Sequence, residues 1–175
     1  MKIKRLLPIA SVLFLLLAFA VPALKAQSAS GIQGAYASDA GKLSDKFTGI
    51  ARVMADKYDW KPGPGVRSMG EVLNLIVVEN GMLTRVLTGS AGAASKPASI
   101  TDSAKLQDAL KSSYADLQNA IRGLSDSDLK SSVKLFGRDM TKQDALMLLI
   151  ADQHEHLGQS IAYARVNGVV PPWSK

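Results

Sequence analysis

The sequence has no cysteine, and it has only two histidines among its 175 residues. Without cysteine, a disulfide scaffold, a thiolate metal site, a cysteine nucleophile and a lipid-anchored leader are all excluded. A phosphate-binding glycine loop, a Ser-His-Asp arrangement and zinc-finger spacing are also missing. Any histidine chemistry therefore starts in one short stretch near the end of the chain, where His154 and His156 lie.

Long apolar runs are confined to the beginning of the chain. Residues 1–7 are basic, the run to Ala20 is almost wholly apolar, and residues 21–26 close it with small side chains. This layout predicts a cleaved secretory signal peptide over residues 1–26 and export to the periplasm. The alternative is a membrane anchor, but it would need about 20 uninterrupted apolar residues, which this run does not provide. A signal peptide selects export only, so the sequence does not separate the periplasm from full secretion.

The basic charge of the chain comes partly from this leader. The whole sequence has 21 basic and 15 acidic residues, and residues 1–26 hold four of the basic ones and no acidic one, which leaves a net charge of +2 after cleavage. So small a charge does not indicate a nucleic-acid partner. We therefore expect neither nucleic-acid binding nor, once the leader is removed, membrane contact.

The remaining chain reads as one helical domain. Residues 27–34 are predicted to be a flexible leader, and residues 35–175 the domain itself. Apolar residues at intervals of three and four predict four long amphipathic helices, over residues 35–57, 68–89, 101–123 and 141–168. Since no stretch shows convincing strand alternation, we expect an all-α fold built as a four-helix bundle.

Two carboxyl-terminal residues form half of a metal site. Asp152 and His156 are four positions apart, so on a helix they point the same way from adjacent turns. His154 lies two positions from each and is predicted to sit on the helix surface. A third ligand has to come from another helix.

Two motifs resemble the DinB-like superfamily. They are Tyr-Asp-Trp-Lys-Pro-Gly-Pro-Gly-Val-Arg-Ser-Met-Gly-Glu at residues 58–71 and His-Leu-Gly-Gln-Ser-Ile-Ala-Tyr-Ala-Arg-Val-Asn-Gly-Val-Val-Pro-Pro-Trp at residues 156–173. The resemblance implies a bundle with up-down-down-up connections and, in many members, a homodimer. It also implies a divalent metal held by three histidines, one on the second helix and two on the fourth. Relatives include thiol-dependent S-transferases.

The histidine set of that family is incomplete in this sequence. The second-helix histidine falls on Leu75, the first fourth-helix histidine on Asp152, and only His156 is kept. A carboxylate can replace an imidazole as a ligand of zinc, nickel or iron. Glu79 lies one helical turn after Leu75 on the same face, so it is the candidate third ligand.

Two interpretations of function remain open at this point. In the first, the metal site is degenerate, no metal is held, Asp152 and His156 bond only to each other, and Glu79 is solvated. In the second, Asp152, His156 and Glu79 bind one divalent metal in an enzyme resembling a thiol S-transferase or a hydrolase. A homodimer and a small-molecule ligand are expected partners, but the substrate and the metal are not specified. The distance of the Glu79 carboxylate from the other two residues separates the interpretations.

Overall fold

Four long helices and one small hairpin make up the fold. The computed structural model describes residues 31–90 and 97–174, so the predicted signal peptide and most of the predicted leader lie outside the described residues. The elements are α1 (Ile32–Val53), a 3-10 turn (Ala55–Lys57), α2 (Met69–Thr88), α3 (Ser103–Arg122), α4 (Asp126–Lys130), β1 (Ser132–Leu135), β2 (Arg138–Thr141) and α5 (Lys142–Val166). Helix α1 begins three residues before residue 35, so its first turn includes the end of the predicted leader.

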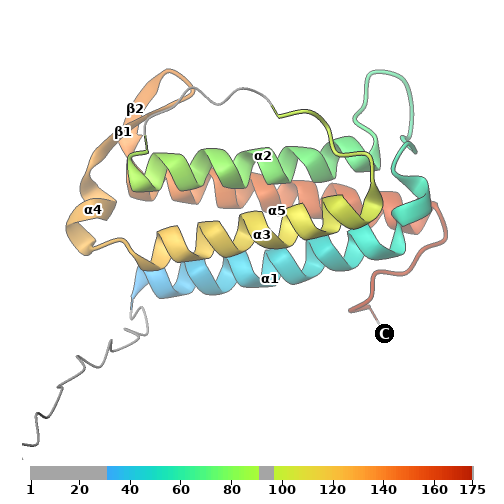
Figure 1. Cartoon of the computed structure of the whole chain (residues 1–175), viewed down its shortest axis with the longest axis horizontal. Coiled ribbons are helices and arrows are strands. Elements are labelled where there is room, and N and C mark those ends of the chain that lie inside the picture. Colours follow the sequence, from blue (N-terminus) through green and yellow to red (C-terminus); the bar gives the residue numbers. More distant parts are fainter. Residues whose placement is uncertain (1–30, 91–96, 175) are drawn as a thin grey trace, which may run out of the picture.

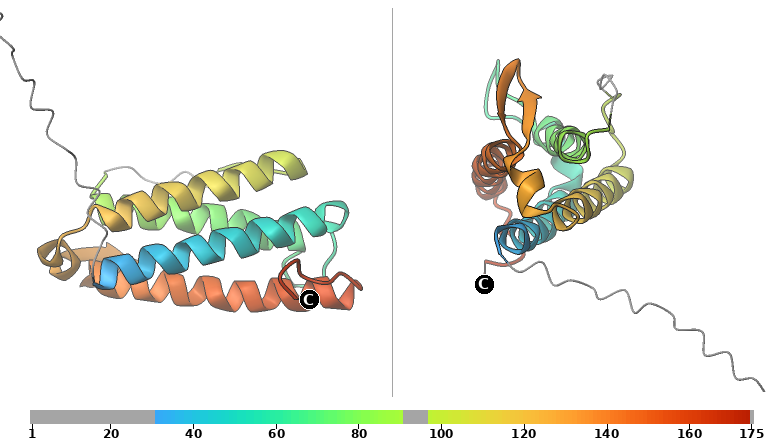
Figure 2. Two further views of the ribbon diagram at one scale, coloured as in Figure 1. Left: turned by 90° about the horizontal axis from the view of Figure 1, so that it is seen from below. Right: turned by 90° about the vertical axis from the view of Figure 1, so that its left-hand side faces the viewer.

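The four long helices form an up-down-down-up bundle, as the sequence predicts. α1 and α5 run in one direction, and α2 and α3 run in the other (Figure 1). α1 packs against α3 and α5, and α2 packs against the same two helices. α1 and α2 are therefore diagonal across the bundle, as the end view of Figure 2 shows. Because α2 and α5 are antiparallel neighbours, side chains from these two helices can meet in one site.

The bundle interior is apolar along its length. Leu43, Phe47 and Ile50 of α1 are fully buried, in agreement with their predicted spacing. The rings of Phe47 and Tyr114 stack across the interior, with their centroids 6.3 Å apart. Burial of such side chains is the main stabilising contribution to the fold. Within the described ranges, no helix has an apolar stretch long enough to cross a bilayer.

The starts of the two helices that carry the candidate ligands are fixed by local sequence. Ser68 accepts a hydrogen bond from the backbone N–H of Glu71, whose carboxylate accepts one from the N–H of Ser68. Thr141 and Asp144 form the same reciprocal pair at the start of α5. Each pair satisfies backbone donors that the first helical turn leaves free.

The connection after α1 closes one end of the bundle. The hydroxyl of Tyr58 donates to the carbonyl of Ala51, and the ring of Trp60 meets that of Tyr163 edge-on at 5.2 Å. Further along, the side chain of Asn74 bonds both the N–H and the carbonyl of Ile100. These contacts hold residues 54–68 against α1 and α5, and the chain entering α3 against α2.

A two-stranded hairpin between α4 and α5 departs from the expectation of a fold without strands. β1 pairs antiparallel with β2, from Ser132 opposite Thr141 to Leu135 opposite Arg138. The strands are only four residues long, and Leu135 alone is buried in them. β1 alternates as Ser-Val-Lys-Leu, but only over four residues, and β2 does not alternate, so the pattern was too short to reveal the hairpin.

Candidate metal centre

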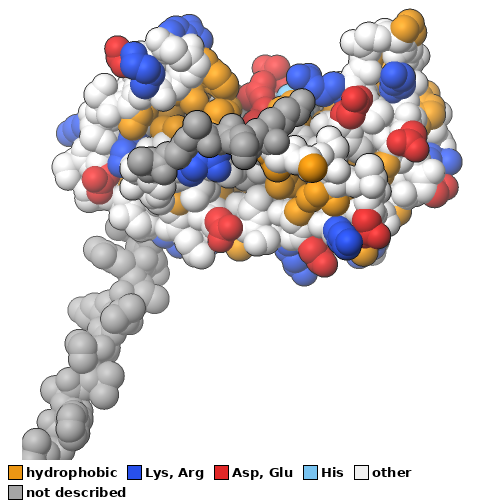
Figure 3. Space-filling view, turned by 45° about the horizontal axis from the view of Figure 1, so that its top comes forward, with side chains coloured by type: hydrophobic (Ala, Val, Ile, Leu, Met, Phe, Trp, Pro, Cys, Tyr) orange, Lys and Arg blue, Asp and Glu red, His pale blue; other side chains and the backbone are white. Residues whose placement is uncertain are grey.

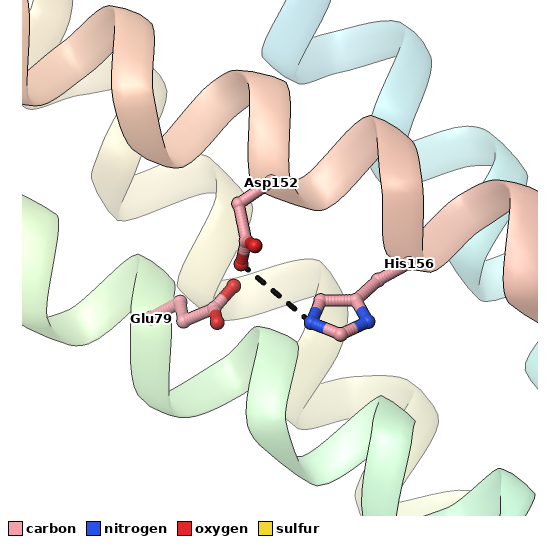
Figure 4. Close-up of side chains that lie close together, drawn as sticks. All are labelled: Glu79, Asp152 and His156. Atoms are coloured by element: carbon pink, nitrogen blue, oxygen red, sulfur yellow. Dashed lines mark ion pairs between the residues drawn. The ribbon is translucent and has the colours of Figure 1, made fainter.

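Three side chains from two antiparallel helices converge on one point. Glu79 projects from the middle of α2, and Asp152 and His156 project from adjacent turns of α5 toward it (Figure 4). One ligand atom from each residue lies within 4.8 Å of the other two. The structure thus brings together the three residues that the sequence indicated. They form a group that could hold a metal ion.

The three residues differ in their exposure to water. Glu79 is 7% exposed, whereas the side chains of His156 and Asp152 are 16% and 43% exposed. The His156 Nε2 and Asp152 Oδ2 atoms are 3.6 Å apart, which is long for a hydrogen bond. The site is therefore closed on the α2 side and open at Asp152. The alternative in which Glu79 is solvated is wrong.

Glu79 is poorly satisfied as a lone carboxylate. Its Oε2 is buried, and no hydrogen-bond partner reaches it within the part of the chain that the structure describes. The pKa of Glu79 is raised to about 8, first because burial disfavours its charged form, and second because Asp152 adds negative charge and accepts a hydrogen bond from the protonated form. Arg67 opposes the rise. A cation between the carboxylates would relieve the same repulsion.

His156 is oriented by a chain of hydrogen bonds on its far side. Its Nδ1 lies 3.0 Å from Oε1 of Gln159, and Gln159 donates through Nε2 to the hydroxyl of Tyr163 at 2.8 Å. The Tyr163 hydroxyl donates to the carbonyl of Arg67 at 3.2 Å. Because the amide oxygen of Gln159 can only accept, Nδ1 is the donor in this contact, and Nε2 faces Asp152 and Glu79. This is the arrangement that orients a metal-binding histidine.

A buried amide pair fixes the distance between the two ligand-bearing helices. Gln153, next to Asp152, donates to Oδ1 of Asn80, next to Glu79, at 2.8 Å. Gln153 also accepts from the Tyr114 hydroxyl at 3.0 Å, and Asn80 donates to Ser113 on α3. Both amides are fully buried. Three helices are therefore held in register directly behind the candidate ligands.

Sequence reasoning did not find this network or the role of Gln159. A signal was present, because Gln153 lies in the apolar stripe of α5 and is one of its few polar members. A polar residue in such a stripe needs a buried partner. The sequence alone did not say which partner it finds.

His154 lies outside the group, as expected. Its Nε2 is 2.7 Å from Oδ2 of Asp39 on α1, and its side chain is 48% exposed. Leu75, which occupies the family's second-helix ligand position, is half-buried and lines a separate hollow with Arg67 and Asn74. The third donor of the group comes from Glu79, one turn further along α2.

Two carboxylates and one imidazole form a donor set that zinc, nickel and iron accept. Three protein ligands leave room for a further ligand, as in metal sites that carry out chemistry. The open side at Asp152 is where such a ligand would enter. The group therefore has the chemical composition of a divalent metal centre.

Comparisons with known proteins agree on one family. The profile of the DinB superfamily matches residues 46–160. A solved DinB-like protein of Bacillus cereus superposes with a TM-score of 0.67 at 23% identity, over 81% of this chain and 95% of that one. A DinB-like protein of Bacillus subtilis gives a TM-score of 0.65 at 18% identity, over 81% and 97%. No curated protein matches the sequence. Similarities at these identities carry the fold alone.

Proposed function

Since the chain belongs to the DinB superfamily, we propose that it is a metalloprotein of that family which binds one divalent cation through Glu79, Asp152 and His156. In this proposal a carboxylate on α5 and a glutamate on α2 take the places of two histidines. Zinc, nickel and iron all suit the donors. The metal-bound interpretation is thereby preferred to that of a degenerate site.

One observation carries this proposal. Glu79 is buried beside a second carboxylate, and its Oε2 has no partner among the described residues. Without a cation, Glu79 has either to bury its negative charge or to hold a proton up to a pKa of about 8, and both cost free energy. In a degenerate site that holds no metal, Glu79 would be expected to be replaced by a residue without this cost. A bound cation instead makes both carboxylates favourable ligands.

The residues present fit the requirements of a bound metal. Glu79 and Asp152 would supply two negative charges, and His156 would supply a neutral nitrogen whose tautomer Gln159 sets. A bound metal would supply Lewis-acid chemistry, which activates water or a thiol for reaction. Around it, Gln153 and Asn80 keep the helices in register and Glu79 closes the inner side to water. We propose thiol transfer or hydrolysis as the reaction classes to test first.

Export and pairing of two copies remain proposals that rest on the sequence. The leader over residues 1–26 has a basic start, an apolar run and small residues before residue 27, which supports export to the periplasm. Light scattering on purified residues 27–175 tests the homodimer, and detection of the protein in a periplasmic extract tests the export.

Metal content tests the proposal directly. Residues 27–175 are purified without a histidine tag and analysed for metals, together with His156→Ala and the matched control His154→Ala. We expect about one zinc, nickel or iron per chain in the wild type and in His154→Ala, and a loss in His156→Ala. Absence of metal in the wild type, even after incubation with each ion, would return the site to the degenerate interpretation.

A further inference from the structure

A hollow of about 600 Å³ adjoins the candidate metal centre, and its lining is mostly apolar. It lies between the hairpin and α5 and is lined by Phe136, Arg138, Met147, Leu148, Asp152 and Glu155, among others. Figure 3 shows hydrophobic side chains gathered beside the raised hairpin, with acidic side chains and a histidine further along the same face. Asp152 belongs to both places, because it lines the hollow and is one of the three candidate ligands.

The hollow and the metal centre share one stripe of α5. Leu148, Asp152 and His156 follow one another at intervals of four residues, so they lie on one face of the helix. From Leu148 to His156 this stripe rises about 12 Å. A molecule lying along it would touch apolar side chains at one end and the metal ligands at the other.

The apolar side chains of the hollow are exposed to an unusual degree. Phe136 is 61% exposed, Met147 55% and Leu148 39%, and they are three of the eight large hydrophobic residues exposed in the described ranges. Gathered around one concave site, they do not resemble the scattered apolar residues found on most surfaces. Their hydrophobic faces have no cover among the described residues.

Phe136 is also held in a conformation that a phenylalanine seldom adopts. It has a φ of 50°, and Gly137 after it has a φ of 77°. A two-residue hairpin turn with both angles positive strongly favours Asn-Gly or Asp-Gly. A phenylalanine there costs conformational energy and leaves its ring in water, and such a strained residue is often functional. A role of the ring as one wall of a binding site would account for both its exposure and the strained backbone.

We propose that this hollow, together with the metal centre, binds a small molecule that has an alkyl or acyl chain and a metal-binding group at one end. The chain would lie against Phe136, Met147 and Leu148, and the end group would reach the metal past Asp152. The volume is in the range of small-molecule sites. This inference rests on the proposed function, because the end group requires the metal.

Chain length is the variable that tests the proposal. Zinc-loaded protein is titrated by calorimetry with octanohydroxamate and with acetohydroxamate, which share the metal-binding group and differ only in the alkyl chain. We expect octanohydroxamate to bind at least about tenfold more tightly, because each buried methylene adds affinity. Equal affinities of the two compounds would overturn the proposal.

Two variants locate the chain in the hollow. Phe136→Asn removes the ring and suits the turn, and Met147→Glu places a charge in the hollow. Both variants are expected to lose most of the difference in affinity between octanohydroxamate and acetohydroxamate. Their metal content and their affinity for acetohydroxamate should stay the same. Val166→Glu, at a 75% exposed position elsewhere on α5, is the control and is expected to keep the difference. A difference that survives in both Phe136→Asn and Met147→Glu would contradict the assignment.

An experiment on the metal-free protein distinguishes the case in which the proposed metal site is wrong from the case in which the proposed ligand site is wrong. If the wild-type protein takes up none of zinc, nickel and iron, the proposed function fails, and the hollow is tested alone with n-octanol by NMR. Shifts confined to the ring of Phe136 and the methyl group of Met147 would uphold the apolar half of the site. Unchanged signals at both residues would overturn it.

Discussion

Two histidine–carboxylate contacts lie two residues apart on α5, and they differ in almost every respect except composition. His154 meets Asp39 of α1 at 2.7 Å, and both side chains are substantially exposed. His156 meets Asp152 at 3.6 Å, is largely buried, and has a second carboxylate, Glu79, beside it. By distance alone the His154 contact is the better ion pair. By surroundings, only the His156 group has the features of a metal site.

The comparison shows which features distinguish a site from a surface contact. The His154 pair involves one carboxylate in a well-solvated position, where an ion pair contributes little to stability. The His156 group has two carboxylates for one imidazole, a buried oxygen without a partner, and a histidine oriented from behind by Gln159. Two carboxyl groups fixed beside an oriented imidazole indicate a cation site better than a short contact does.

Replacing the aspartate of each contact gives the largest expected contrast. Asp152→Asn removes a charged ligand, and we expect zinc affinity to fall by about 100-fold. Asp39→Asn changes the contact of His154 in the same way and is expected to leave zinc affinity unchanged. Calorimetric titration of the metal-free proteins measures both. A similar loss in the two variants would place the metal elsewhere.

Removing the hydrogen bond that orients His156 is expected to have the next largest effect on zinc affinity. Gln159→Leu removes the acceptor of Nδ1 and is expected to weaken zinc binding by about 10-fold or more, as changes behind metal ligands do. Gln159→Glu restores an acceptor and should recover most of the affinity. Zinc competition with a chromogenic chelator measures the series. Equal loss in both variants would mean that side-chain packing, and not the hydrogen bond, matters at this position.

Glu79 predicts a pH dependence of stability for the metal-free protein. Its pKa is about 8 in the folded state against an ordinary value of 4.5, so between these pH values the folded state keeps a proton that the unfolded state has released. The stabilisation is complete below the lower value and is lost as pH rises through the upper one. Between about pH 5 and pH 8, wild type should lose about 2 kcal/mol relative to Glu79→Gln.

Urea unfolding in the presence of a chelator measures this difference. Glu79→Gln keeps the shape of the side chain and cannot ionise, so the slope of its stability against pH lacks this contribution. Parallel curves for wild type and Glu79→Gln would contradict the raised pKa. Saturating zinc should remove the difference in slope, because the metal replaces the proton.

Removing the contact between His154 and Asp39 is expected to have the smallest effect of the changes considered. His154→Ala is expected to change the free energy of unfolding by less than about 1 kcal/mol, with the change decreasing at high salt. Thermal unfolding of this variant at low and high salt measures it. A larger loss that does not depend on salt would show that the exposed pair is a structural link between α1 and α5, which would narrow the contrast with His156.

Much of this fold is determined by local signals that the sequence displays openly. The long helices follow from apolar spacing, and the starts of α2 and α5 follow from the pairs Ser68–Glu71 and Thr141–Asp144. The hairpin does not, because its strands are short and its turn begins with Phe136 where asparagine would have indicated a turn. Its position depends on packing against α5, which single residues do not reveal.

The candidate site, like the fold, could be predicted from the sequence only in part. Asp152 and His156 are predictable because four residues along a helix fix their common direction. Glu79 was reached through its spacing from Leu75, and its burial beside Asp152 depends on how α2 packs on α5. The Gln153–Asn80 pair joins residues 73 positions apart in the sequence. Partners so distant are selected by the tertiary fold, and helical periodicity contains no information about them.

X-ray absorption at the zinc edge, on tag-free residues 27–175 loaded with one zinc per chain, tests the central claim most directly. The account predicts a first shell with a single imidazole and otherwise oxygen donors, unchanged in His154→Ala, whereas His156→Ala should not retain the zinc. Two imidazoles in the wild-type spectrum would contradict it, because the second would have to come from His154 or from another copy of the chain.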